Sequence, residues 1–281
     1  MQLDEEKELK KLVASGIRIP PQPKVVIELQ ELILGGDYDV REVVKIISQD
    51  PGIVAMLFKA SKSPVFARGR ALTSLDKVVM VVGVKQVFNL VQAAALATTV
   101  SDGARKAFEV FWTRSTEVAQ IAALIADERV SVCNVFPEQA FMAGIFHECG
   151  VPVLMMRFPE YCKALQLESA QCFPSLSEED AKFNVDHTTI GYLVARHWKL
   201  PNFVCAAIRY HHELPDDEMG ASLTLVSILQ LAIHFYHRMN RQSSPLWDAI
   251  GGRVLAEIGL SADEEDDFFG QIADKFHGVD D

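Results

Sequence analysis

Apolar residues spaced three or four apart recur along most of this chain of 281 residues, and that periodicity limits its fold more than any other feature. It is the period of a helix with one buried face, whereas a strand with one buried face alternates every second residue. Segments with strand alternation are hard to find. Proline, glycine and helix-capping residues separate the helical stretches. The sequence therefore predicts an all-α protein built as a bundle of many helices.

Particular residues mark where several of these helices begin and end. Asp50 followed by Pro51 is typical of an N-cap and a first helical turn. Gly83 follows a periodic apolar stretch, as a C-terminal glycine does. Ser175 and Glu178 have the spacing of a capping box, in which each side chain bonds the backbone of the other residue. These residues predict helix boundaries at each of these points. Ser74 is predicted to cap a further helix, and helices are predicted over about 105–128 and 159–169.

The predicted helices fall into two blocks. The charged segment 2–14 is predicted to be a surface helix, and the proline-rich segment Ile19–Pro23 separates it from the next helices. The segment Ser101-Asp102-Gly103 is the best candidate for a boundary between the blocks, and its shortness implies tight docking. We therefore expect an N-terminal helical subdomain over residues 1–103, packed on a second helical subdomain over residues 104–281.

Charge and composition exclude several classes of function. The chain has 38 acidic and 27 basic residues and a formal net charge of −11, without the basic stripe of a nucleic-acid binder. The same charge disfavours anionic membranes, and no apolar run reaches the roughly 20 residues of a membrane span. The five cysteines form no C-x-x-C pair, and the charged first residues do not resemble a signal peptide. We expect a reduced, cytoplasmic protein without nucleic-acid or membrane partners.

A group of histidines is the candidate functional site. The candidates for metal ligands are His147, Glu148, His187, His211 and His212, each predicted at or near a helix end. Imidazoles and carboxylates gathered around one core are ligands that zinc, iron and manganese accept. A structural alternative exists for each histidine alone, because an imidazole at a helix C-terminus is stabilised by the helix dipole and by free carbonyl groups.

The order of the motifs resembles a known family. The segment Gly144–Gly150, which contains His147-Glu148, resembles the histidine-aspartate signature of the HD superfamily of metal-dependent phosphohydrolases. The segments Ile19–Pro23 and Ile46–Gly52, and Trp198–Pro201 with the His211-His212 pair, continue the pattern of the HDOD family of HD-related output domains. The resemblance covers roughly residues 17 to 235. It implies an HD-domain-like helical bundle with a helical N-terminal subdomain.

The resemblance also shows which ligands are altered. A catalytic HD site has an outer histidine, a histidine-aspartate pair and a final aspartate, and this chain has Arg114 or Ser115 at the first position. Glu148 replaces the aspartate of the central pair, and Ile233 stands at the final position. His211 and His212 resemble the extra histidines of related cyclic-dinucleotide phosphodiesterases. The resemblance thus implies a degenerate metal site.

Three functions follow from these observations. The leading hypothesis is a non-catalytic HDOD signal-transduction or interaction module, which needs no cofactor and binds a signalling protein or a small-molecule ligand. The alternative is a metal-dependent phosphohydrolase acting on a phosphomonoester or a cyclic nucleotide, with Glu148 and the histidines holding Fe, Mn or Zn. A structural adaptor without a ligand is the third. The altered ligand set favours the first.

Overall fold

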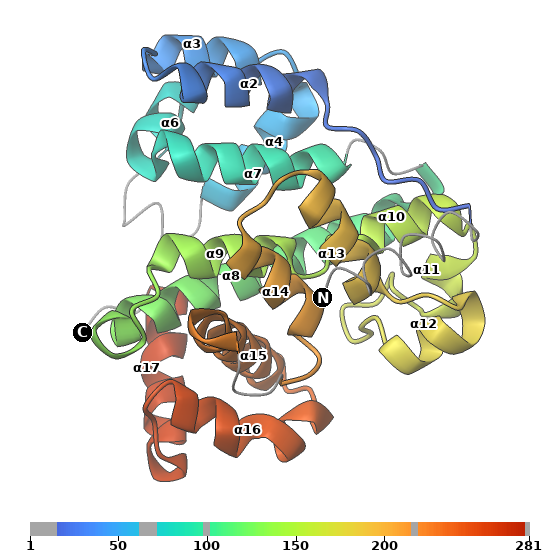
Figure 1. Cartoon of the computed structure of the whole chain (residues 1–281), viewed down its shortest axis with the longest axis vertical. Coiled ribbons are helices and arrows are strands. Elements are labelled where there is room, and N and C mark those ends of the chain that lie inside the picture. Colours follow the sequence, from blue (N-terminus) through green and yellow to red (C-terminus); the bar gives the residue numbers. More distant parts are fainter. Residues whose placement is uncertain (1–15, 62–71, 98–101, 215–218, 279–281) are drawn as a thin grey trace.

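The computed structural model of the protein describes residues 16–61, 72–97, 102–214 and 219–278. Within these ranges the regular elements are helices and no strand occurs, which confirms the all-α prediction (Figure 1). The predicted surface helix over residues 2–14 lies outside the described residues. No single described helix has the length and hydropathy of a membrane span, and the segments Leu75–Val82 and Val84–Leu96 reach them only as a pair bent by 115°.

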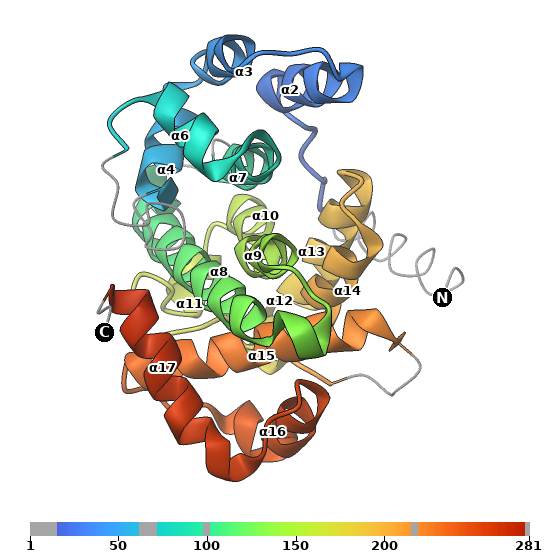
Figure 2. The ribbon, with the colours of Figure 1, turned by 90° about the vertical axis from the view of Figure 1, so that its left-hand side faces the viewer.

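The N-terminal helices form a unit at one end of the molecule, shown in blue and teal (Figures 1 and 2). They are α2 (Lys24–Gly35), α3 (Val40–Ile47), α4 (Pro51–Ser61), α6 (Leu75–Val82) and α7 (Val84–Ala97). Their apolar stripes meet in a buried core that includes Leu29, Ile47, Ile53 and Val78. Burying a large apolar side chain stabilises the folded state by about 1.5–3 kcal/mol. This burial holds such short helices together.

The residues predicted to bound these helices do so. The Asp50 carboxylate accepts hydrogen bonds from two backbone N–H groups of the first turn of α4, at 2.9 and 3.1 Å. The Ser74 hydroxyl caps α6 by accepting a hydrogen bond from the Lys77 backbone N–H at 3.3 Å. Gly83 ends α6 with a φ of +86°, which glycine adopts at low cost. Local capping therefore fixes the turns of this unit.

The remaining helices surround the long helix α8 (Arg105–Cys133), which runs five residues beyond the predicted end at residue 128. They are α9 (Pro137–Phe146), α10 (Gly150–Arg157), α11 (Tyr161–Ala164), α12 (Leu176–Phe183), α13 (His187–His197), α14 (Asn202–Tyr210), α15 (Ala221–Met239), α16 (Pro245–Glu257) and α17 (Glu265–His277). Figure 2 shows α8 between the N-terminal unit and the C-terminal helices α15–α17. It is therefore the element that both ends of the fold share.

The two faces of α8 belong to two different apolar cores. Phe111, Ala119 and Ala123 contribute to a core that continues into the N-terminal unit. Ile121 and Ile125 point into a second core made with α15, α16 and α17. The N-terminal unit is thus packed on the rest of the molecule through a continuous core, whereas the predicted domain boundary after residue 103 stays a prediction.

The proline-rich segment near the N-terminus is tied to the end of α13. The indole N–H of Trp198 donates to the carbonyl of Pro20 at 3.0 Å, and the Gln22 amide donates to the Trp198 carbonyl at 3.4 Å. Trp198 itself is buried. Two motifs that lie far apart in the sequence therefore form one contact.

Two glycines allow α10 and α13 to approach closely. A Cβ atom on Gly150 would lie 2.1 Å from the carbonyl oxygen of His187 and 2.7 Å from the backbone nitrogen of Gly191. A Cβ atom on Gly191 would in turn lie 3.2 Å from the Gly150 nitrogen. Only glycine fits both positions without moving backbone, so this crossing sets the distance between the two helix ends that carry the histidines.

Two sequence predictions in the middle of the chain are wrong. The helix predicted over residues 159–169 is reduced to α11, because Gln166 has a φ of +54° and ends any helical path. The predicted capping box at Ser175 does not form, since its hydroxyl lies 3.1 Å from the hydroxyl of Ser177. The Glu178 carboxylate instead pairs with Lys182 one turn later.

We predict that Gly150→Ala destabilises the protein by about 2–3 kcal/mol, because the new methyl group collides with backbone that cannot move without separating two helices. The matched control is Gly252→Ala in α16, where a Cβ would meet nothing within 4 Å. We expect that change to alter stability by less than about 1 kcal/mol, in the stabilising direction. Urea unfolding followed by circular dichroism measures both. Equal effects of the two changes would contradict this account of the crossing.

Candidate functional site

The histidines of the site come from the ends of three helices. His147 directly follows α9, and His211 directly follows α14. His187 is the first residue of α13, whose N-terminus is capped by Asp186 through a hydrogen bond from the Thr189 backbone at 2.9 Å. The groups found near these helix ends, two backbone carbonyls and one carboxylate, fix the orientation of the His147, His211 and His187 rings.

Two of the rings are held by the carbonyl groups of their own helices. The Nδ1–H of His147 donates to the Gly144 carbonyl at 2.6 Å, and the Nδ1–H of His211 donates to the Ile208 carbonyl at 2.7 Å. A neutral imidazole carries one proton, so its Nε2 atom is then a free acceptor or metal ligand. Nε2 of His211 faces His187, and the His147 ring lies edge-on to His211.

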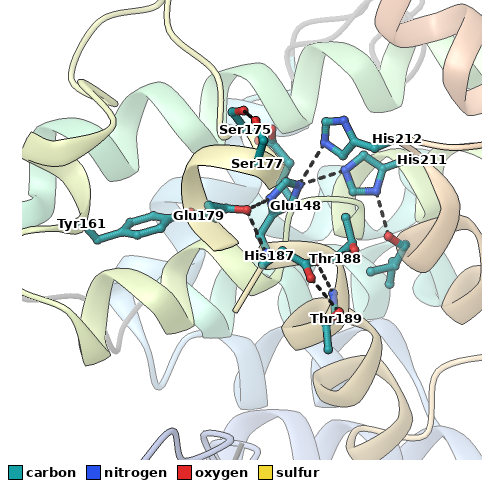
Figure 3. Close-up of polar contacts among 12 residues, drawn as sticks. Glu148, Tyr161, Ser175, Ser177, Glu179, His187, Thr188, Thr189, His211 and His212 are labelled. Atoms are coloured by element: carbon teal, nitrogen blue, oxygen red, sulfur yellow. Dashed lines mark hydrogen bonds and ion pairs between the residues drawn. The ribbon is translucent and has the colours of Figure 1, made fainter. Parts of the chain in front are cut away.

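His187 is held by a buried carboxylate. Its Nδ1 lies 2.7 Å from Oε2 of Glu179, which also accepts the His187 backbone N–H at 3.1 Å. The other oxygen of Glu179 accepts a hydrogen bond from the Tyr161 hydroxyl. Figure 3 shows Glu179 lying between Tyr161 and His187. A carboxylate on the far nitrogen of a histidine is the arrangement that orients metal-binding imidazoles in proteins.

On the opposite side of the His187 ring, its Nε2 atom lies close to the Nε2 atoms of two other histidines. Its Nε2 lies 3.2 Å from Nε2 of His211 and 3.1 Å from Nε2 of His212 (Figure 3). The ligand atoms of this group, which we call the histidine triad, lie within 4.8 Å of one another. Two imidazole nitrogens at such a distance need a proton or a metal ion between them, because two lone pairs repel.

The protonation states of the triad differ. Burial would lower the pKa of His187, but the charge and hydrogen bond of Glu179 outweigh burial and raise it. Burial and the neighbouring imidazoles lower the pKa of His211 well below its usual value and that of His212 to about 3. Of the three rings, His187 is therefore the one that most readily takes up a proton. With a metal, three neutral nitrogens form a donor set that zinc, iron or manganese accepts.

The carboxylate of Glu148 is not free to join this set. Its Oε2 accepts hydrogen bonds from Nε and Nη2 of Arg114 at 3.0 and 2.9 Å, and both side chains are almost completely buried. Burial would raise the pKa of Glu148, but the charges of Arg114, His147 and His187 outweigh burial and lower it to about 2. Glu148 is therefore an anion whose charge is already balanced.

The structure brings some of the predicted site residues together and leaves others apart. It brings His187, His211 and His212 together, and it places the His147 ring edge-on to His211 with 5.1 Å between ring centroids. Glu148 lies beside them but is paired with Arg114. Of the two positions at which the resemblance finds a ligand missing, Ile233 packs against the second core. The buried hydroxyl of Ser115 has no hydrogen-bond partner among the described residues.

Sequence reasoning missed Glu179 and Tyr161. Glu179 lies in an acidic stretch with Glu178 and Asp180, and no sequence signal separates the buried member from its exposed neighbours. Tyr161 lies in the segment wrongly predicted as a long helix. Only the fold of the segment between α11 and α13 brings the two residues to His187.

The comparison with protein families agrees with this geometry. The profile of the HDOD domain matches residues 19–214, which is more than half of the chain. The chain belongs to the HDOD family. An uncharacterized protein of Treponema pallidum (strain Nichols) is 25% identical over 222 residues. That match covers 77% of this chain and 42% of the relative, so the chain spans about two fifths of the length of the relative.

Solved structures share the fold of this HDOD chain. An HDOD domain protein of unknown function from Geobacter sulfurreducens is 22% identical, with a TM-score of 0.61 and coverage of 96% of this chain and 97% of its own. A candidate metal-dependent phosphohydrolase from Shewanella amazonensis SB2B is 19% identical, with a TM-score of 0.65 and coverage of 98% of each chain. A candidate signal transduction protein from Marinobacter aquaeolei VT8 is 18% identical, with a TM-score of 0.66 and coverage of 98% and 65%. At these identities the likeness concerns the fold.

We predict that acidification from pH 6.5 toward pH 4 destabilises the protein through the triad. The folded state keeps His211 and His212 neutral, while the unfolded state binds their protons near pH 6.5, so stability falls with falling pH. The contribution of His187 to the pH dependence of stability has the opposite sign. Its raised pKa stabilises the folded state at low pH, and this stabilisation is lost as the pH rises. His212→Gln should reduce the dependence by up to about 1.4 kcal/mol per pH unit.

Urea unfolding at a series of pH values measures this dependence. The control is His197→Gln, which removes an exposed imidazole of α13 outside the triad. An unchanged slope in His212→Gln, or an equal change in both variants, would contradict the assignment of the acid sensitivity to the triad.

Proposed function

We propose that this protein is a non-catalytic HDOD signal-transduction module that acts by binding a partner. Membership of the family supports this role, and so does the state of the site. The proposed partner is a signalling protein or a small-molecule ligand in the cytoplasm. The net charge of −11 disfavours nucleic acid as a partner.

The observation that carries the proposal is the ion pair between Glu148 and Arg114. Metal-dependent hydrolysis needs a metal with fixed ligands and an open coordination position. In this chain the carboxylate beside the triad is bound to a guanidinium through two hydrogen bonds instead. The fold-family positions at Ser115 and Ile233 supply no replacement carboxylate or imidazole. The donor set is therefore three imidazoles, and the one carboxylate of the predicted set, Glu148, is already paired.

A cavity on another part of the surface supports ligand binding away from the triad. It has a volume of about 270 Å³ and lies between α2, α7 and α9. Ile33, Phe88 and Met142 supply its apolar lining, and the amides of Gln86 and Asn89 lie at its wall. A ligand there would contact the N-terminal unit and α9 together. Because α9 leads directly to His147, such a ligand would act on the orientation of the site.

A metal-dependent phosphohydrolase remains the second candidate, and the convergence of the three Nε2 atoms favours it. The residues fit one first-row metal ion, which His187, His211 and His212 would hold. Such an ion, when bound, would polarise an oxygen of a phosphomonoester or cyclic nucleotide as a Lewis acid. Glu179 would keep the His187 ring oriented, with Tyr161 fixing the carboxylate behind it.

Metal content and hydrolysis together separate the two candidates. The protein is purified without added metal, analysed for elements, and then assayed on p-nitrophenyl phosphate and on a cyclic dinucleotide with added Mn²⁺, Fe²⁺ or Zn²⁺. We expect no hydrolysis above the rate of buffer with metal, whether or not an ion is bound. This outcome supports the module, because a bound ion without turnover is a structural one.

The variants His212→Ala and His234→Ala sharpen the assay. His234 is a suitable control because it stacks on Trp247 and pairs with Glu265, outside the triad. Hydrolysis that needs a metal, is lost in His212→Ala and persists in His234→Ala would overturn the non-catalytic proposal in favour of the second candidate.

A further inference from the structure

The buried carboxylate of Glu148 needs a counter-charge, and a side chain of this protein supplies it. The side chain is about 5% exposed and lies against the histidine triad. A buried, ionised carboxylate costs several kcal/mol unless a counter-charge lies in contact with it. In a site rich in imidazoles, the usual counter-charge is a metal ion. Here it is the guanidinium of Arg114.

Arg114 is fixed on each side that the structure describes. Besides its two hydrogen bonds to Glu148, its Nη1 donates to the carbonyl of Cys172 at 3.1 Å. Its guanidinium also lies 4.6 Å from the ring centroid of Phe173, a cation–π distance. A group held by a carboxylate, a carbonyl and an aromatic face has little freedom to leave.

The segment that provides two of these contacts is itself anchored. The Gln242 amide donates to the carbonyl of Ala170 at 3.0 Å and to the side chain of Gln171 at 3.1 Å. The Phe173 ring also packs on His237, with 4.4 Å between ring centroids. The segment Ala170–Phe173 therefore closes over Arg114 and separates the Glu148 side of the site from the exterior.

We propose that the Arg114 guanidinium is a built-in cation that takes the place of a metal ion at Glu148. It differs from a metal ion in two respects: it cannot dissociate from the chain, and it keeps its charge at every pH at which the protein is folded. The site thus has two halves. In one, Arg114 occupies the position beside the Glu148 carboxylate permanently, and in the other, the histidine triad can hold one ion. This inference rests on the proposed non-catalytic function and explains how the core keeps its shape whatever the metal supply.

An ordinary buried salt bridge and a metal substitute predict different results when the arginine is removed. After Arg114→Ala, either interpretation predicts a large loss of stability, because Glu148 is left buried without a counter-charge. Only the interpretation of Arg114 as a metal substitute predicts that a divalent cation restores the lost stability. The vacated space then lies between the Glu148 carboxylate and the Cys172 carbonyl, two oxygen ligands suited to Mn²⁺.

The test measures the Tm of each variant with and without Mn²⁺. Because the histidine triad can itself bind Mn²⁺, the informative quantity is the Tm increase in Arg114→Ala minus the increase in the wild-type protein. We expect an excess of about 2–3 °C at roughly ten times the Kd of the new site. The double variant Arg114→Ala/Glu148→Gln has no carboxylate to neutralise and should lose this excess.

A second arginine serves as the matched control. Arg129 also lies on α8 and donates to backbone carbonyls, those of Ile258 and Gly259, at 2.6–3.1 Å. Arg129→Ala should lower the Tm without any excess response to Mn²⁺. If Arg114→Ala does not fold, Arg114→Gln replaces it, because glutamine fills more of the space and is neutral.

The outcomes distinguish this inference from the function on which it rests. No excess response in Arg114→Ala or Arg114→Gln overturns the inference, as does an excess that persists in the double variant. Either result leaves the non-catalytic proposal intact. Hydrolysis by the wild-type protein would overturn that proposal instead.

Discussion

The site depends first on the contact between the backbones of α10 and α13. Gly150 and Gly191 let these helices touch without side chains between them. The turn that carries His147 and Glu148 leads directly into α10, and His187 opens α13. The distance between the two halves of the site is therefore set by packed backbone. No ligand is needed to bring them together.

Charge balance is the second constraint, and it is met locally. Glu148 and Glu179 are both buried, and each has its own partner, the Arg114 guanidinium and the His187 imidazole respectively. Each pair also has further hydrogen-bond donors or acceptors, such as the Tyr161 hydroxyl and the Cys172 carbonyl. Buried charges are stable only when they are paired and hydrogen-bonded in this way. The two halves of the site still interact, because the charges of His147 and His187 help to lower the pKa of Glu148.

The fold was predictable from sequence because helix periodicity and capping are local. The Asp50 cap and the end of α6 at Gly83 are confirmed, since each depends on backbone within one turn. The segment 159–175 was predicted wrongly. Its short turns are stabilised by contacts with distant residues such as Gln242, which no local pattern reveals.

The site was predictable only in its residue types and their order. The resemblance pointed to His187, His211 and His212, and their Nε2 atoms do converge. Sequence also indicated that Arg114 or Ser115 stands at an altered ligand position. It did not reveal that Arg114 binds Glu148, because a salt bridge between residues 34 apart depends on the geometry of two helices. Whether the triad holds a metal stays a prediction.

The contact between Trp198 and Pro20 has a consequence for how the chain folds during synthesis. The two residues are 178 positions apart, so the proline segment emerges from the ribosome long before its partner. At about 5–20 residues per second the delay is roughly 10–35 s. The face of α7 that α9 and α10 cover stays exposed until those two helices have been made. The proline segment therefore stays without its Trp198 partner until most of the chain has been made.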